Sequence, residues 1–190
     1  MDLETQSDES LVLQCQQGQG QFFGQLYERY FEKIYNFIYY RTRHKQTAED
    51  LTAQVFYKTL NSLLKFNAKK GKFSTWIFSI ARNGLIDFYR TNHNTEDIEN
   101  AWDLSSADNL EKSADTAAAM ASLAKALQTL EKQQREVVLM RLWDGLSYKE
   151  IAEILNLGES NCKMIFRRTL EKLQKQTPTA LLLLFLIKNL

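Results

Sequence analysis

Turn-forming residues are scarce in this chain, because its 190 residues include only seven glycines and one proline. A β-sandwich or β-barrel needs many tight turns, which Gly and Pro usually form, so a chain this poor in both is expected to be mostly helical. The apolar residues agree: from Phe22 to Ile38 they recur at the spacing of a single helical stripe. We therefore predict an all-α fold.

Helical patterns and capping residues divide the chain into short helices. The expected helices cover residues 8–17, 21–43, 47–65, 75–90, 117–129, 132–143, 148–155 and 160–175. Three N-caps are expected in the first half: Ser7 or Asp8 for the first helix, Thr47 for the third and Ser74 for the fourth. Asp50 would support Thr47 in a capping-box-like arrangement. The third helix is expected to bury Leu51, Val55, Leu60 and Leu63 or close neighbours.

Charge is strongly segregated along the sequence. Residues 22–92 contain twelve Lys and Arg against five Asp and Glu, and residues 117–176 contain ten against seven. Between them, residues 93–116 carry seven acidic side chains and one lysine. Two basic blocks on either side of an acidic connector suggest two modules that contact a polyanion. We predict a helical domain over 1–92, an acidic linker over 93–116, a second helical domain over 117–176 and an apolar tail over 177–190.

A helix-turn-helix pattern lies between Gly145 and Leu173. Ser147 and Glu150 form the S-x-x-E capping box of a short helix. Asn156 follows, a residue that tolerates the left-handed conformation at a helix end, and Cys162 begins the next apolar stripe. The opposite face of that second helix carries donors suited to phosphates and base edges: Ser160, Asn161, Lys163, Met164, Arg167 and Arg168. An ordinary helical hairpin with a basic outer face is the alternative.

Residues 66–90 interleave aromatic and cationic side chains. This combination suits single-stranded nucleic acid, whose bases stack on aromatic rings while cations follow the backbone, and an unpaired base can also be held in a loop pocket. The alternative is that the aromatic stripe is core, which we favour for Trp76 and Ile80. Packing explains the loop lysines, Arg82 and Asn83 less well.

Catalytic and metal chemistry find no support in the sequence. Its two cysteines and two histidines do not stand at metal-ligand spacing, and there is neither a carboxylate pair nor a phosphate-binding loop. We expect no catalytic residue, no metal and no cofactor, and two reduced thiols, Cys15 and Cys162, in a cytoplasmic protein. The acidic N-terminus does not resemble a signal peptide.

Three stretches resemble the sigma factors of bacterial RNA polymerase, specifically the extracytoplasmic-function type. Residues 48–56 are similar to the segment that docks on the polymerase clamp. Residues 73–83, with Asp87 and Arg90, are similar to the helix that recognises and melts the −10 element. Residues 145–152, with Arg167 and Arg168, are similar to the helix-turn-helix that binds the −35 element. The chain departs from the family at Ala53-Gln54, where Gln-Glu is usual, so the charge at the clamp contact is reduced.

The resemblance implies three sets of binding residues. The polymerase clamp would be contacted by Asp50, Leu51, Gln54 and Phe56. The loop from Phe66 to Phe73 would capture a base of the non-template strand, and the whole strand-binding set is Phe66, Asn67, Lys69, Lys70, Lys72, Phe73, Arg82, Asn83 and Arg90. The −35 duplex would be contacted by Ser160, Asn161, Lys163, Met164, Arg167 and Arg168.

The implied function is promoter recognition, strand opening and transcription initiation by a non-enzymatic factor. Its partners would be core RNA polymerase and promoter DNA, both double-stranded and melted, and an anti-sigma factor is a further candidate. The apolar run 180–187 is too short for a bilayer, which needs about 20 residues. It could fold back on the second domain, contact a regulator, touch a membrane surface or bind the first domain in an inhibited state. A stand-alone helix-turn-helix regulator, a nucleic-acid enzyme and an interaction module without promoter activity are the rival functions.

Overall fold

The structure is a computed structural model that describes residues 6–42, 44–91 and 125–176. These residues form helices and connecting turns and contain no strand, which confirms the predicted all-α class. The chain divides into two compact units, Met1–His93 and Asn94–Leu190. The expected acidic linker and apolar tail lie outside the described residues. In the part of the chain that is described, no helix combines the length and apolar character needed to cross a bilayer.

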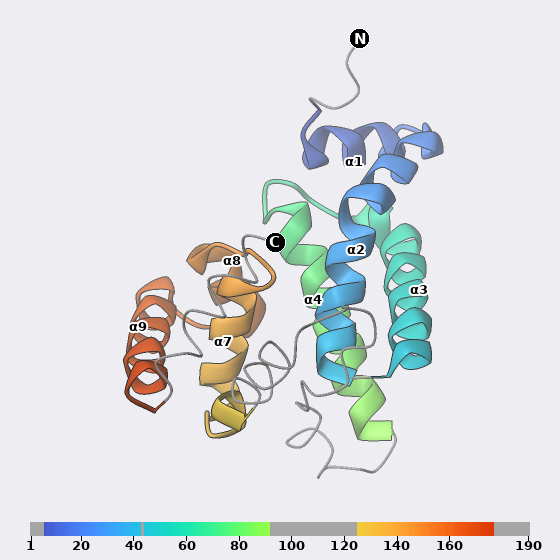
Figure 1. The fold of residues 1–190 in the computed structure, drawn as a ribbon. Coiled ribbons are helices and arrows are strands. Elements are labelled where there is room, and N and C mark those ends of the chain that lie inside the picture. Colours follow the sequence, from blue (N-terminus) through green and yellow to red (C-terminus); the bar gives the residue numbers. More distant parts are fainter. Residues whose placement is uncertain (1–5, 43, 92–124, 177–190) are drawn as a thin grey trace. The chain divides into compact units, whose positions relative to one another are not determined.

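The first unit is a bundle of three long helices with a short helix across one end. These are α2 (Phe23–Thr42), α3 (Lys45–Ser62) and α4 (Phe73–Thr91), with α1 (Asp8–Gln16) lying across them (Figure 1). Two 3₁₀ turns, η2 (Gly20–Phe22) and η3 (Leu63–Lys65), precede α2 and follow α3. Phe37 of α2 and Phe78 of α4 are buried and meet edge to face, with ring centroids 5.3 Å apart.

Two of the predicted N-caps are wrong. Helix α3 begins at Lys45 and its N-cap is His44, whose Nδ1 accepts a hydrogen bond from the Thr47 amide at 3.2 Å. The imidazole occupies the capping position, so Thr47 lies inside the first turn. Ser74 is likewise inside its helix, because α4 starts at Phe73, whose amide donates to Glu9 Oε1 at 3.3 Å.

The buried face of α3 agrees with the expected one except at Leu60. Leu51, Val55 and Leu63 are buried as predicted, but Leu60 is 48% exposed. Thr59 and Phe56 lie in the core in its place. Thr59 satisfies its hydroxyl by donating to the Val55 carbonyl at 2.7 Å, which lets a polar residue occupy a core position.

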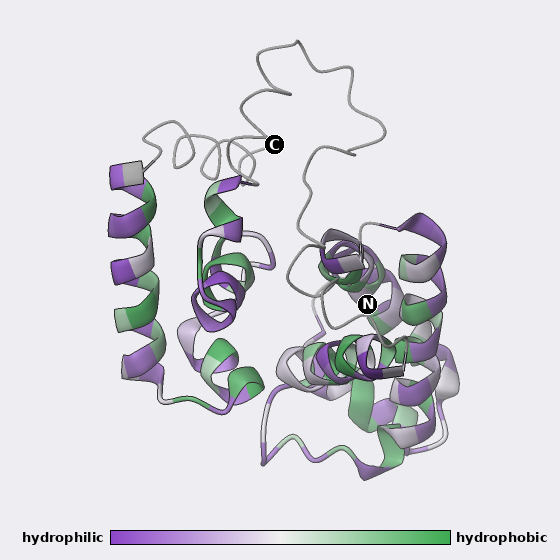
Figure 2. Cartoon of the chain, turned by 90° about the horizontal axis from the view of Figure 1, so that it is seen from below, coloured by the Kyte–Doolittle hydropathy of each residue, from purple (hydrophilic) through white to green (hydrophobic). Residues whose placement is uncertain are grey.

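The second unit packs α7 (Lys132–Leu142), α8 (Tyr148–Leu155) and α9 (Glu159–Gln176) with a helical turn over residues 125–128. Its core unites Leu127, Val138 and Leu173. Arg135 is buried and donates to the carbonyls of Leu127 at 2.9 Å and Leu130 at 3.0 Å. Its guanidinium therefore adds hydrogen bonds to carbonyls at the end of the preceding turn, where the Leu127 carbonyl also accepts from the Leu130 amide. On α9, hydrophobic and hydrophilic residues occupy different sides (Figure 2).

Candidate nucleic-acid interface

The capping box at the start of α8 is confirmed. The Ser147 hydroxyl accepts from the Glu150 amide at 3.3 Å, and Glu150 Oε2 accepts from the Ser147 amide at 2.8 Å. These reciprocal bonds satisfy two of the amides that a helix start leaves open. They fix where α8 begins and thus the direction in which it enters the turn.

The turn between α8 and α9 depends on a left-handed residue. Asn156 adopts φ 54° and ψ 50°, and beyond it the Leu157 amide donates to the Ala152 carbonyl at 2.8 Å. Cys162 then packs with no exposed surface at the start of α9. Burial raises the pKa of its thiol, and the charge of Glu159 raises it further. Because the thiolate is the reactive form, this cysteine is a packing residue.

The exposed side of α9 presents most of the predicted duplex-binding residues together. Exposed side chains are Ser160, Lys163, Met164, Arg167 and Arg168, whereas Asn161 is half-buried. Their spacing places the five on one stripe of the helix. Lys163 pairs with Glu159 at 2.6 Å and Arg167 with Glu171 at 3.0 Å. Such exposed pairs contribute about 1 kcal/mol or less, so a phosphate can replace the carboxylate as partner.

The loop between η3 and α4 combines an ordered turn with exposed cations. Asn67 Oδ1 accepts from the Lys69 amide and its carbonyl accepts from the Lys70 amide, both at 2.9 Å. Lys69, Lys70 and Lys72 are exposed. Asn67 therefore stabilises the turn that holds the lysines, and its own side chain is also exposed.

Aromatic rings pack together at the two ends of this loop. Phe66 packs on Trp76, with ring centroids 5.1 Å apart, and on Phe73 at 6.0 Å. Phe73 has no exposed surface, so its predicted contact with a DNA strand would require the core to open. Phe66 and Trp76 are half-buried and keep part of their rings accessible.

Helix α4 carries the remaining strand-binding candidates. Asn83 and Arg90 are exposed and lie seven residues apart on one face, while Arg82 is half-buried. Arg90 forms an exposed ion pair with Asp87 at 3.2 Å. The loop and α4 belong to one unit and adjoin at Phe73, so both groups of strand-binding candidates lie on the same helical body.

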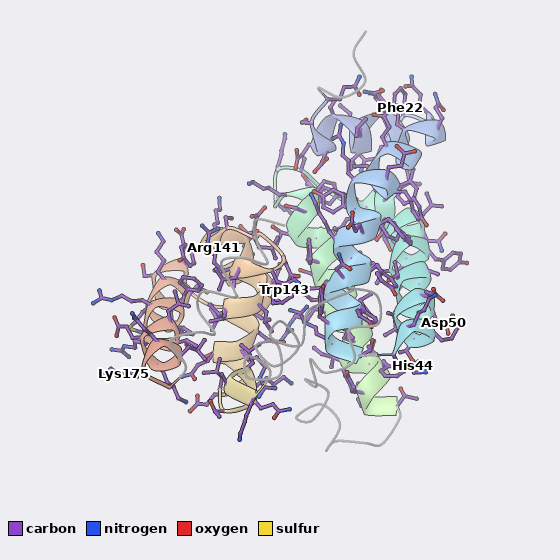
Figure 3. The ribbon with its side chains drawn as sticks, viewed as in Figure 1. Phe22, His44, Asp50, Arg141, Trp143 and Lys175 are labelled. Atoms are coloured by element: carbon purple, nitrogen blue, oxygen red, sulfur yellow. The ribbon has the colours of Figure 1, made fainter. Side chains whose placement is uncertain are left out.

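The predicted polymerase-binding residues separate into two groups on α3. Asp50 and Gln54 are exposed, and Figure 3 shows Asp50 at the outer side of the helix. Leu51 and Phe56 are only 6% and 5% exposed, so they hold α3 in the bundle. The structure thus leaves the polar pair available to a partner and places the apolar pair beneath it.

Exposed apolar side chains beside this pair were not predicted as functional. On α3, Tyr57 is 69% and Leu60 48% exposed; on α2, Tyr27 and Phe31 are 41% and 40% exposed. Tyr27 packs at a tilt against the buried Phe56, with ring centroids 4.7 Å apart. The signal in the sequence is an aromatic at every fourth residue from 27 to 39, which reads equally well as a core stripe. Apolar surface of this kind marks docking sites for other proteins.

Metal ligands are not clustered. Within residues 6–42, 44–91 and 125–176, no three His, Cys, Asp or Glu side chains are placed to hold an ion. His44 caps α3, and Cys15 and Cys162 are free thiols.

Comparisons with known proteins match both units. Residues 26–95 match the family model Sigma-70 region 2, and residues 120–173 match Sigma-70, region 4. The chain is 31% identical to the ECF RNA polymerase sigma factor BldN of Streptomyces coelicolor, over 88% of this chain and 65% of BldN. It is also 31% identical to the RNA polymerase sigma factor YlaC of Bacillus subtilis, over 79% of this chain and 88% of YlaC.

Solved structures share the fold. A structure of CnrH in complex with the cytosolic domain of CnrY superposes with a TM-score of 0.67 at 22% identity, covering 90% of this chain and 96% of that one. The sigma factor RpoE from Bartonella quintana, in complex with the anti-sigma factor NepR, gives 0.60 at 22% identity, over 81% of this chain and 95% of that chain. Because both regions are matched in order and the identity to YlaC spans most of that relative, the chain belongs to the bacterial RNA polymerase sigma factors, among which BldN is named as an ECF member.

Proposed function

We propose that this protein binds core RNA polymerase and directs promoter recognition, strand opening and transcription initiation, while polymerase performs the nucleotide chemistry. One observation carries the proposal. Each of the two units exposes a cationic surface, and the two surfaces suit different forms of DNA. One is the exposed stripe of α9 that carries Ser160, Lys163, Arg167 and Arg168, and the other is a loop of lysines that adjoins aromatic rings.

The second unit would read duplex DNA through α9. A helix-turn-helix places its second helix in the major groove, where Arg and Lys contact guanine edges and phosphates. Arg167 and Arg168 lie about two turns beyond Ser160 on the exposed stripe, so donors extend along the helix. Asn161, half-buried beside that stripe, would contact DNA only at its edge.

The first unit would hold the melted non-template strand. Phe66 and Trp76 offer partly accessible rings for base stacking, and Lys69, Lys70 and Lys72 offer charges for the backbone. Arg82, Asn83 and Arg90 would continue this path along α4. Phe73 would support the path from the core.

Core polymerase would dock on α3 and the adjoining face of α2. Asp50 and Gln54 supply polar contacts, and Tyr27, Phe31 and Tyr57 supply apolar area that is otherwise in water. Leu51 and Phe56 would act indirectly by fixing the helix. Such a protein works where polymerase works, so we place it in the cytoplasm.

An anti-sigma factor is a further proposed partner. The similar structure of RpoE holds a sigma factor together with an anti-sigma factor. The division into an N-terminal domain, an acidic linker over 93–116, a second domain and a tail stays a prediction. So does any contact of the tail with a regulator or a membrane surface.

Run-off transcription tests the proposed function. Purified core polymerase, with and without this protein, would be offered a library of genomic fragments from the source organism. We expect discrete transcripts that require the protein and disappear when Arg167 and Arg168 are both changed to Ala. Lys175→Ala is the matched control, since Lys175 is an exposed cation in the last turn of the same helix (Figure 3). No protein-dependent transcript from any fragment would refute the proposal.

A stand-alone helix-turn-helix regulator is the second candidate. The capping box and the left-handed turn of the second unit suit both functions. The exposed loop of the first unit favours the sigma factor, because a duplex-binding repressor has no use for a single-strand surface. Sedimentation with core polymerase discriminates, since the regulator would not co-sediment.

A further inference from the structure

Helix α1 makes side-chain contacts to both ends of the lysine loop. Gln16 Nε2 donates to the carbonyls of Leu63 at 2.8 Å and Phe66 at 2.9 Å. Glu9 Oε1 accepts from the Phe73 amide at 3.3 Å. Residues 67–72 lie between these contacts, so one short helix brackets the segment that carries Lys69, Lys70 and Lys72.

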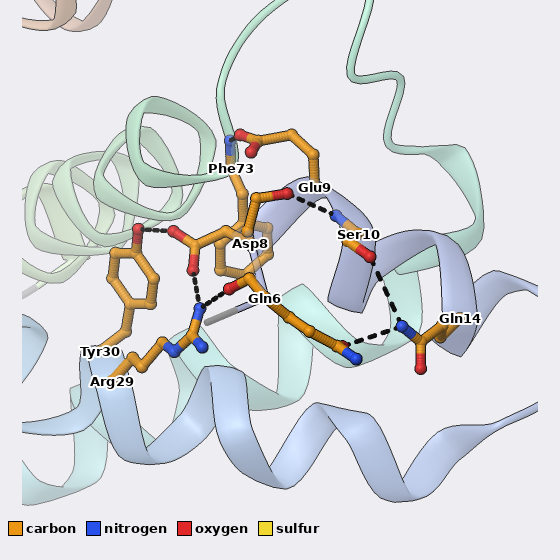
Figure 4. A network of polar contacts seen from close by, with 9 residues as sticks. Gln6, Asp8, Glu9, Ser10, Gln14, Arg29, Tyr30 and Phe73 are labelled. Atoms are coloured by element: carbon orange, nitrogen blue, oxygen red, sulfur yellow. Dashed lines mark hydrogen bonds and ion pairs between the residues drawn. The ribbon is translucent and has the colours of Figure 1, made fainter. Parts of the chain in front are cut away.

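Helix α1 is itself fixed to the bundle. Leu11 and Val12 are buried, with 0% and 2% of their surface exposed. Asp8 accepts from Arg29 Nη1 at 2.8 Å and from the Tyr30 hydroxyl (Figure 4). Since both partners belong to α2, α1 is also held to the bundle by contacts outside the loop.

The two bracketing contacts have different chemistry. Gln16 donates from its amide nitrogen to the carbonyl of Leu63, the first residue of η3, and to that of Phe66, which follows η3 and begins the loop. Glu9 places a carboxylate at the first turn of α4, where it binds an open amide and interacts favourably with the helix dipole. Together they reduce the conformational freedom that the loop would lose when it closes on a base.

We propose that Gln16 and Glu9 are positioning residues that set the loop 67–72 in the conformation needed to capture a non-template base. Neither side chain is required to touch DNA. The inference rests on the proposed function for its biological meaning, but its structural half, restraint of the loop by α1, is independent of that function.

The structural half is tested by hydrogen–deuterium exchange on the full free chain. Gln16→Glu keeps the size of the side chain but replaces the two donors with a carboxylate facing two carbonyls. Gln17→Glu is the matched control, because Gln17 is the exposed neighbour and the charge change is the same. We expect backbone amides in residues 67–73 to exchange about 5- to 30-fold faster in Gln16→Glu and at the wild-type rate in Gln17→Glu. Equal exchange in both variants would overturn the inference.

The functional half is tested with holoenzyme and single-stranded oligonucleotides of the non-template strand from a promoter identified by run-off transcription. Wild type is first used to find the position at which an abasic site weakens binding most. In Gln16→Glu and Glu9→Ala, binding of the intact oligonucleotide should fall roughly 5- to 30-fold, and the additional loss caused by the abasic site should shrink or vanish. Glu9→Gln keeps an acceptor for the Phe73 amide and should restore most of the wild-type value.

Other causes give different results. If the variants merely destabilised the fold, intact and abasic oligonucleotides would lose affinity by the same factor, which overturns the inference. Gln16→Ala, which introduces no charge, provides a milder second variant if Gln16→Glu unfolds, and the same criterion applies. If wild type supports no transcription, the proposed function fails, while the exchange experiment still decides whether α1 restrains the loop.

Discussion

Substitutions at Asn156 test the energetic cost of a backbone conformation with little change in side-chain packing. Asn156 is the non-glycine residue with positive φ among the described residues, at φ 54° and ψ 50°, and its side chain is exposed. Substitutions there remove little packing, so their effects report the cost of the left-handed conformation. We predict the stability order Gly equal to or above Asn, then Ala, then Val.

The magnitudes follow from the backbone. An L-residue in this conformation costs about 1–2 kcal/mol, and Asn lowers that cost through local hydrogen bonds. Glycine removes the strain but adds freedom to the unfolded chain, so Asn156→Gly should lie within about 1 kcal/mol of wild type. A β-branched residue is disfavoured most, and Asn156→Val should lose about 2 kcal/mol or more. That loss corresponds to a decrease of roughly 8–16 °C in the melting temperature of a domain this small.

Thermal unfolding followed by circular dichroism measures this order. Glu153 supplies the control, because it is exposed within α8 at an ordinary helical position. At position 153 the Gly variant should be less stable than the Val variant, since glycine is the poorer helix former by a few tenths of a kcal/mol. The order of Gly and Val should therefore reverse between positions 153 and 156. If Val and Gly at position 156 melt together, the left-handed turn does not limit stability and the reasoning is refuted.

Three other predictions concern stability, DNA binding and thiol chemistry. Gly84→Ala should stabilise the first unit by up to about 1 kcal/mol in thermal unfolding, because a Cβ there meets nothing within 4 Å; a lower melting temperature would mean that Gly84 has an unseen role. Replacing both Arg167 and Arg168 by Ala should reduce the slope of log binding constant against log salt concentration for duplex DNA by about 2, while Lys175→Ala leaves it nearly unchanged. Equal slopes in both variants would show that α9 does not contact the DNA. Burial raises the pKa of the Cys162 thiol, so iodoacetamide should label it slowly until the chain is unfolded. The unfolded thiol ionises first, so stability is lost as pH rises past the ordinary thiol pKa, and a Cys162→Ser variant should lack this loss.

The helix-turn-helix could be predicted from sequence because its determinants are local. Ser147 and Glu150 are three residues apart, and Asn156 specifies its own conformation. Capping and turn preferences act over a few bonds, so no knowledge of the fold is needed. Cys162, placed in the apolar stripe by the same pattern, is fully buried.

The start of α4 could not be predicted, because its cap comes from a distant part of the chain. Glu9 is 64 residues away from Phe73 and reaches it only through the packing of α1. Ser74 is a residue type preferred at N-caps, but the tertiary contact from Glu9 places the start of α4 one residue earlier, at Phe73. The N-cap role of His44 was not predicted for a different reason: imidazole is an uncommon N-cap, and Thr47 is a more usual one.

Burial resolves an ambiguity that a family motif leaves open. Within the segment 48–56, Asp50 and Gln54 are exposed whereas Leu51 and Phe56 lie in the core. Sequence similarity cannot distinguish a residue that contacts polymerase from one that holds the contacting helix in place, because polymerase binding needs both. The two roles predict different failures. Truncating a buried member such as Phe56 should cost about 3–5 kcal/mol and impair polymerase and single-strand binding together, because α3 and α4 share a core. Changing Gln54 to Ala should leave the melting temperature within a few degrees and weaken polymerase binding alone. Equal loss of stability in both variants would show that burial does not separate the two roles.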